Sequence, residues 1–139
     1  MRYAICFFPA VGLFCGAALW LWAVIAQATG MSGVLFASVA ASLPILVTGG
    51  IHMDGYLDTV DALASHQTRE KKLEIMKDPS CGAFAVIYSG VYLLAYAGFA
   101  CEVYLAWKIL LLCPLFVLSR ALSGLCAVNL PNARKAGML

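Results

Sequence analysis

The chain has 139 residues, of which 63% are hydrophobic and only 12% are charged, and its formal net charge is +2. Soluble domains carry about 25% charged residues, so this composition excludes an ordinary soluble protein and indicates an integral membrane protein. No Lys/Arg patch with interleaved aromatic residues is present, so nothing in the sequence indicates nucleic-acid binding.

The charged residues are concentrated in one block. The segment 52–79 holds six of the seven acidic residues and four of the nine basic ones, whereas 3–51 and 80–101 contain no Asp, Glu, Lys, Arg or His. Charge-free runs of this length exceed the about 20 residues that cross a bilayer as a helix, and they lack the alternation of a barrel strand. Charge kept beside such segments usually serves a function.

We predict an all-α, polytopic membrane protein with about four transmembrane helices, in a single domain covering 1–139. The expected membrane helices are Tyr3 to Ala28, Val34 to Thr48, a segment from near Gly82 to near Cys101, and Ile109 to Ala127. Between the second and third, we expect segment 52–79 to be an amphipathic helical segment that carries the active site.

An acidic stripe opens this segment. Asp54, Asp58 and Asp61 are spaced i, i+4 and i+7, which places them within about 60° of arc on one helix face. No Lys or Arg lies between residues 3 and 68, and two carboxylates about 6 Å apart repel by about 3 kcal/mol at an effective dielectric of about 20. A divalent cation removes this repulsion, and an all-oxygen site suits Mg²⁺ or Mn²⁺. A solvated acidic helix face is the alternative.

Two residues flank the stripe. His52 falls about 160–180° from the acidic face of a continuous helix, so we expect it to support the site or contact substrate rather than bind metal. Gly55 leaves room among the acids for the close approach of a phosphorylated ligand, with tight helix packing as the alternative.

A second short amphipathic helix is expected from Arg69 to Asp78, with Thr68 as its N-cap and Pro79 after its end. Arg69 and Lys77 are candidates for binding substrate phosphates, the alternative being that they only set topology. In the last membrane helix, Arg120 is the one charged residue. It either snorkels to the surface or turns inward to the acidic site or a substrate phosphate.

The loop cations predict the orientation. Arg2, the four cations of 52–79, Arg134 and Lys135 fall on one side of the predicted helices, and only Lys108 falls on the other. Because cytoplasmic loops are enriched in Lys and Arg, both termini and the charged segment are predicted to be cytoplasmic.

Residues 49–61, Gly-Gly-Ile-His-Met-Asp-Gly-Tyr-Leu-Asp-Thr-Val-Asp, resemble the signature of cobalamin synthase, the adenosylcobinamide-GDP ribazoletransferase that closes the nucleotide loop of vitamin B12. The similarity continues through Arg69, 73–78 and 82–84, and 7–13 and 119–120 are similar to further segments of the family. Ala62 replaces the family's usual Gly, and Pro-Ser-Cys at 79–81 replaces a Ser-Arg type of step. Family members are longer, so the resemblance predicts a short or truncated member.

The resemblance implies a Mg²⁺-dependent transferase of a bacterial or archaeal cell membrane, with Mn²⁺ as an alternative cofactor. A ribose hydroxyl of α-ribazole, or of its 5′-phosphate, attacks the cobinamide-side phosphate of adenosylcobinamide-GDP and GMP leaves. The expected catalytic and metal-binding residues are Asp54, Asp58 and Asp61. The expected substrate-binding residues are His52, Gly55, Arg69, Lys77, Asp78 and Arg120.

The expected partners are the corrinoid nucleotide, α-ribazole and the lipid bilayer, and a homo-oligomer is left open. Two other functions remain open from the residues alone. One is a Mg²⁺-dependent membrane phosphotransferase of the CDP-alcohol phosphotransferase kind, although the Ala-Arg step and later Asp motif of that family are missing here. The other is a non-catalytic transporter or assembly subunit, which would place its ionisable groups near the middle of the membrane.

Overall fold

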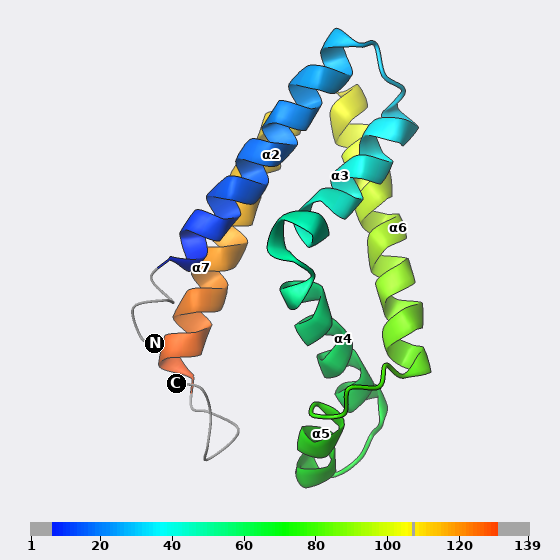
Figure 1. The fold of residues 1–139 in the computed structure, drawn as a ribbon, viewed down its shortest axis with the longest axis vertical. Helices are drawn as coiled ribbons and strands as arrows, with labels where there is room; N and C mark the ends of the chain where they lie inside the picture. The colour runs from blue at the N-terminus through cyan, green and yellow to red at the C-terminus, as the bar shows by residue number, and fades with distance from the viewer. Residues whose placement is uncertain (1–6, 107, 131–139) are drawn as a thin grey trace.

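The computed structural model describes residues 7–106 and 108–130, and within them every regular element is helical (Figure 1). The elements are, in chain order, α2 Phe8–Ala28, α3 Gly33–Thr48, α4 Ile51–Ala64, α5 Arg69–Ile75, α6 Ala83–Leu105, the 3₁₀ turn η1 Ile109–Leu111, and α7 Cys113–Asn129. The predicted all-α class is confirmed.

Two long helices, α2 and α7, form an antiparallel pair, and α3 and α4 lie along α6 (Figure 1). Glycines bring the backbones of α2 and α7 together. A Cβ atom at Gly12 would lie 2.5 Å from the carbonyl oxygen of Phe116, and one at Gly16 would lie 2.8 Å from that of Cys113. Small residues at such contacts let membrane helices approach closely.

This contact predicts a large stability effect for Gly12→Ala. The added methyl group meets backbone atoms that cannot rotate away, so we expect a loss of about 1–3 kcal/mol or more in the free energy of unfolding. The measurement is denaturant unfolding in micelles, followed by circular dichroism. The matched control is Gly90→Ala in α6, where an added Cβ meets nothing within 4 Å. Equal stability of the two variants would contradict the packing described here.

The structure has three to four candidate membrane spans, in agreement with the prediction of about four. Within the described residues, α2, α6 and the segment Ile109–Asn129 are each long and apolar enough to cross a membrane. The predicted second span is only 16 residues long in α3, about 24 Å at 1.5 Å per residue, which is short of the about 30 Å of hydrocarbon. A fourth span exists only if α3 and α4, bent by 97°, count as one.

The bend between α3 and α4 has a local cause. Gly49 ends α3 with φ of 61° and Gly50 begins α4 with φ of 78°, a left-handed conformation that glycine adopts without strain. A Cβ at either position would meet nothing within 4 Å. The backbone conformation therefore explains the glycine pair, and packing within the described chain does not require glycine at either position.

Several helix boundaries also differ from their predicted positions. Helix α2 begins at Phe8 rather than Tyr3, with Pro9 in its first turn, a position that proline favours. Helix α5 ends at Ile75 instead of Asp78, and Thr68 stands at its N-cap without a side-chain capping bond. Arg2, Arg134 and Lys135, on which part of the orientation depends, lie outside the described residues.

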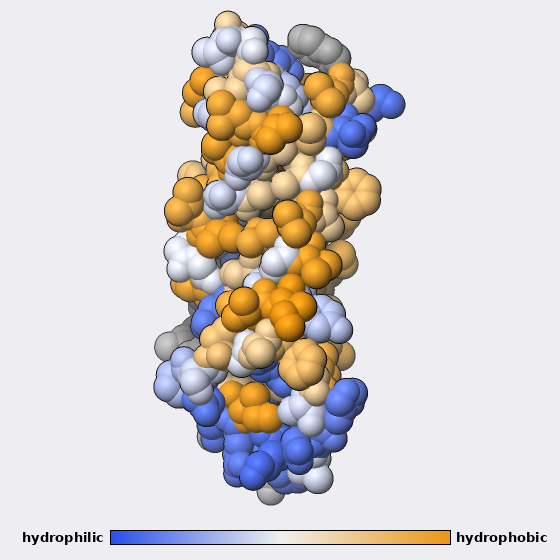
Figure 2. Space-filling model, turned by 90° about the vertical axis from the view of Figure 1, so that its right-hand side faces the viewer, coloured by the Kyte–Doolittle hydropathy of each residue, from blue (hydrophilic) through white to orange (hydrophobic). Residues whose placement is uncertain are grey.

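The buried core lies where α2, α3 and α6 meet, at the end of the molecule away from α5. The Phe36 ring stacks on Tyr104 with centroids 4.2 Å apart, and the Trp22 indole donates a 3.1 Å hydrogen bond to the Phe36 carbonyl. Elsewhere many large apolar side chains are exposed. Figure 2 shows them along most of one face, with hydrophilic residues gathered at the α5 end. This outward apolar surface is that of a multi-pass membrane protein.

Candidate functional site

The acidic face of α4 opens onto a pocket at the charged end of the molecule. Asp54, Asp58 and Asp61 line this pocket, whose volume is about 320 Å³, together with Lys77 and Asp78 from the segment after α5. We call it the acid pocket. The structure thus brings together the three aspartates of the stripe and two of the predicted substrate-binding residues, because α5 folds back against α4.

The three aspartates are not equivalent. Both carboxylate oxygens of Asp61 accept hydrogen bonds from the start of α6: Oδ2 from the Gly82 amide at 2.6 Å and Oδ1 from the Ala85 amide at 2.9 Å. Asp61 therefore caps a helix that begins more than twenty residues later in the chain. A Cβ at position 82 would lie 2.7 Å from Asp61 Oδ1, so a larger residue there would have to displace the Asp61 carboxylate.

Sequence reasoning missed this cap, although one signal for it was present. The residue at the N-cap of α6 is Gly82, which has no side chain to accept the free amides of the first turn. Such amides need an acceptor from elsewhere when they are not in water. A carboxylate on a neighbouring helix supplies it here.

Asp54 and Asp58 remain open to a ligand. Asp54 is exposed and Asp58 is half-buried, and no hydrogen bond or ion pair joins either carboxylate to another described residue. As neighbours at i and i+4, their Cβ atoms lie about 6 Å apart. Both negative charges line the same pocket.

The carboxylates of Asp54 and Asp58 fit a magnesium ion, but the three aspartates do not converge on one point. Across residues 7–106 and 108–130, no three His, Cys, Asp or Glu side chains are grouped closely enough to hold a metal ion. Mg²⁺ is usually bound through one or two carboxylates, with waters and substrate phosphates completing its shell. Asp54 and Asp58 meet that requirement, while the joint three-aspartate site stays a prediction.

The opposite wall of the acid pocket carries one cation and one further carboxylate. The Ser80 hydroxyl and the Ser80 amide both donate to Asp78 Oδ1, the amide at 2.9 Å. These two hydrogen bonds hold the pKa of Asp78 below its ordinary value, and the bond from the hydroxyl has the larger effect. This exposed carboxylate therefore stays ionised. Of the described residues that line the pocket, Lys77 is the one with positive charge.

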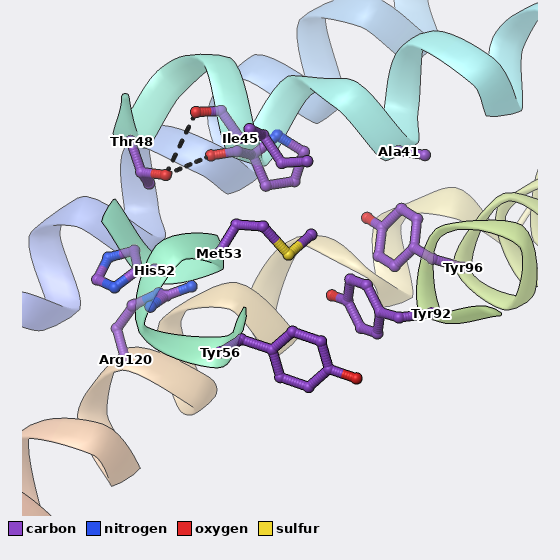
Figure 3. A pocket seen from close by; sticks show the side chains of 10 residues that line it. Ala41, Ile45, Thr48, His52, Met53, Tyr56, Tyr92, Tyr96 and Arg120 are labelled. Atoms are coloured by element: carbon purple, nitrogen blue, oxygen red, sulfur yellow. Dashed lines mark hydrogen bonds between the residues drawn. The ribbon is translucent and has the colours of Figure 1, made fainter. Parts of the chain in front are cut away.

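A second cavity, of about 180 Å³, lies on the opposite side of α4 (Figure 3). We call it the tyrosine cavity, and its lining residues are Ala41, Pro44, Ile45, Thr48, His52, Met53, Tyr56, Tyr92, Tyr96 and Arg120. His52 lies here, away from the acids, as its helical position predicts. Arg120 turns into the protein rather than to its surface, but into this cavity and not into the acid pocket.

The remaining predicted site residues lie apart from both cavities. Arg69 is exposed at the first position of α5 and is not among the residues that line the acid pocket. Gly55 is exposed on α4, and a Cβ there would meet nothing within 4 Å. Packing within the described chain therefore does not require glycine at position 55.

Comparisons with known proteins cover the whole chain. The sequence pattern of the family described as cobalamin-5-phosphate synthase matches residues 1–139. A curated relative from Lachnoclostridium phytofermentans, named adenosylcobinamide-GDP ribazoletransferase, is 48% identical over 139 residues, which is 100% of this chain and 53% of the relative. A relative of the same name from Clostridium perfringens is 34% identical over 125 residues, 88% of this chain and 49% of the relative.

A third relative with that name, from Desulfitobacterium hafniense, is 43% identical over 88 residues, 63% of this chain and 34% of the relative. The chain thus spans about half the length of the curated relatives that match nearly all of it. No solved structure matches.

Proposed function

Because this chain belongs to the cobalamin-5-phosphate synthase family, we propose that it acts as a membrane transferase joining adenosylcobinamide-GDP to α-ribazole or its 5′-phosphate. The products are adenosylcobalamin, or its 5′-phosphate, and GMP. The observation that carries the proposal is the acid pocket at the hydrophilic end of a multi-pass membrane protein, lined by Lys77 and by two carboxylates that have no partner among the described residues.

The chemistry of the pocket suits a diphosphate substrate. Unshielded aspartates repel such a polyanion, so Asp54 and Asp58 require Mg²⁺ or Mn²⁺, which when bound neutralises charge on the phosphates. Lys77 on the facing wall pairs with a phosphate oxygen. Asp61 keeps the acidic face of α4 at a fixed position on α6 through its two hydrogen bonds.

The transfer itself needs one proton acceptor. The ribose hydroxyl forms an O–P bond to the cobinamide-side phosphate while the P–O bond to GMP breaks, and GMP leaves with the electron pair. Asp54 or Asp58, neither of which has a partner among the described residues, accepts the hydroxyl proton. Asp61 is less suited to this role because both of its oxygens already accept hydrogen bonds.

The test is GMP release by the purified chain in lipid nanodiscs, with adenosylcobinamide-GDP as donor and α-ribazole or α-ribazole 5′-phosphate as acceptor. We expect release to need both substrates and Mg²⁺, and to stop with EDTA. CMP release from a CDP-alcohol in the same assay, without GMP release, would instead support a phosphotransferase of that kind. No release from either donor would contradict the proposed activity.

We propose further that the acid pocket faces the cytoplasm of the producing bacterial or archaeal cell, because the topology predicted from the sequence puts seven of the eight loop cations on the side of segment 52–79. The measurement is labelling of intact cells with a membrane-impermeant maleimide, in a variant without native cysteines. Gln67→Cys, between α4 and α5, should be protected, and Lys108→Cys, at the opposite end, should react; both native residues are exposed. Labelling of position 67 but not 108 would reverse the orientation.

A further inference from the structure

The tyrosine cavity contains a positive charge that has no negative partner among the described residues. Arg120 is the one charged residue of α7, part of a segment apolar enough to span a membrane, and its Nε atom is buried without a hydrogen-bond partner. All seven Asp and Glu residues of the sequence lie in the described part of the chain, and none of them lines this cavity. A guanidinium in such surroundings is costly unless an anion pairs with it.

A second polar group in the cavity also lacks a partner. The hydroxyl of Tyr96 is buried and makes no hydrogen bond, which costs free energy until an acceptor is supplied. Figure 3 shows the Tyr92 and Tyr96 hydroxyls, from α6, pointing into the cavity from one side, and the Arg120 guanidinium, from α7, on the other side beside His52, with the Met53 side chain between them in this view. These donors approach from two helices, so they match a ligand with acceptor atoms on more than one side.

The size of the space limits the ligand further. At about 180 Å³, the cavity is smaller than the about 300–1,000 Å³ of pockets that enclose drug-sized molecules. It suits a small anionic group rather than a whole dinucleotide. A tetrahedral phosphoryl group offers several acceptor oxygens and accepts the planar fork of an arginine side chain through two of them.

We propose that the tyrosine cavity is an anion site that binds a phosphoryl group, with Arg120 as the counter-charge and the Tyr92 and Tyr96 hydroxyls as hydrogen-bond donors. The phosphoryl group belongs either to a water-soluble phosphate monoester or to a phospholipid headgroup. Helix α4 separates this site from the acid pocket, so binding here needs no metal ion. The site does not depend on the proposed transfer reaction, and it can be tested without turnover.

The first arm of the test uses soluble probes. The purified 139-residue chain, in phospholipid-free detergent with EDTA, is titrated with inorganic phosphate and with ribose 5-phosphate at constant ionic strength, and binding is followed by intrinsic fluorescence and by the shift in Tm. We expect saturable binding that Arg120→Gln weakens at least tenfold and Tyr96→Phe weakens about 2- to 12-fold, as for the loss of one hydrogen bond.

The second arm tests the lipid source. Native mass spectrometry of the chain extracted from membranes measures how much phospholipid each variant retains. We expect a tightly held phospholipid in the wild type that is lost in Arg120→Gln, if the headgroup is the ligand. Binding of soluble phosphate assigns the site to a monoester, and lipid retention without soluble binding assigns it to the headgroup.

The matched control is Lys108→Gln, which removes the same charge at an exposed position outside the cavity and should bind like the wild type. If Arg120→Gln does not fold, Arg120→Lys keeps the charge without the planar fork and should show a smaller loss. The proposal is overturned if neither arm detects a ligand. It is equally overturned if Arg120→Gln and the wild type bind alike in both arms.

Discussion

Replacing Asp58 by Asn is expected to weaken Mg²⁺ binding by about tenfold or more, and replacing Asp54 by Asn should do the same. Each change keeps the size of the side chain and removes one of the two charges in the acid pocket that have no partner within the part of the chain that the structure describes. A carboxylate near a divalent cation contributes several kcal/mol of attraction even at an effective dielectric of about 20, and 1.4 kcal/mol already equals a factor of ten.

The measurement is titration of the chain with Mn²⁺, followed by electron paramagnetic resonance, with Mg²⁺ as the competitor. Glu70→Gln and Glu74→Gln provide the matched control, because they remove the same charge from α5 at exposed positions that do not line the acid pocket. A variant that keeps its metal affinity but loses GMP release would identify the proton acceptor. If both aspartate variants kept the metal affinity of the wild type, the acidic stripe would be a solvated helix face and not a metal site.

Asp61 is expected to behave differently from its two neighbours. Asp61→Ala removes the acceptor of two amides at the start of α6, so we expect the free energy of unfolding to fall by about 1–3 kcal/mol. Asp61→Asn keeps one carbonyl acceptor but turns an NH₂ group toward a second amide donor, and should also destabilise. Asp58→Asn should leave stability unchanged or raise it, because it relieves repulsion with Asp54.

Hydrogen exchange of the Gly82 and Ala85 amides reports on this cap directly, and denaturant unfolding gives the total effect. Gly82→Ala tests the same contact from the other side, since its Cβ would lie 2.7 Å from Asp61 Oδ1. If Asp61→Asn left amide exchange and stability unchanged while abolishing metal binding, Asp61 would be a ligand and not a cap. That result would restore the equal roles that the sequence spacing suggests.

Helix periodicity was enough to predict the acidic face of α4, because side chains at i, i+4 and i+7 share a face wherever the helix lies. The same periodicity placed His52 on the other side. It could not predict that Asp61 bonds to Gly82 and Ala85, since that contact depends on how the chain returns after α5. Nor could it bring Arg120 beside Tyr92 and Tyr96, because those residues lie on two further helices.

The membrane spans show a related limit. Composition identified α2, α6 and α7 correctly, since a long charge-free run has few alternatives to a membrane helix. It also placed the end of α3 at Thr48, as the structure has it, but it did not show whether so short a helix crosses the membrane without α4. Two successive left-handed glycines end α3 after 16 residues, and the sequence Gly-Gly marks a break without giving its angle of 97°.

The cap at Asp61 has a mechanical consequence for the acid pocket. Its two hydrogen bonds join the last turn of α4 to the first residues of α6. The two ends of the connecting segment 62–81 are therefore held next to each other. We therefore expect a change of length within segment 62–81 to leave the position of α4 on α6 unchanged. The pocket therefore has one wall anchored to a membrane helix, and its other wall, bearing Lys77 and Asp78, belongs to a loop that the Asp61 cap closes.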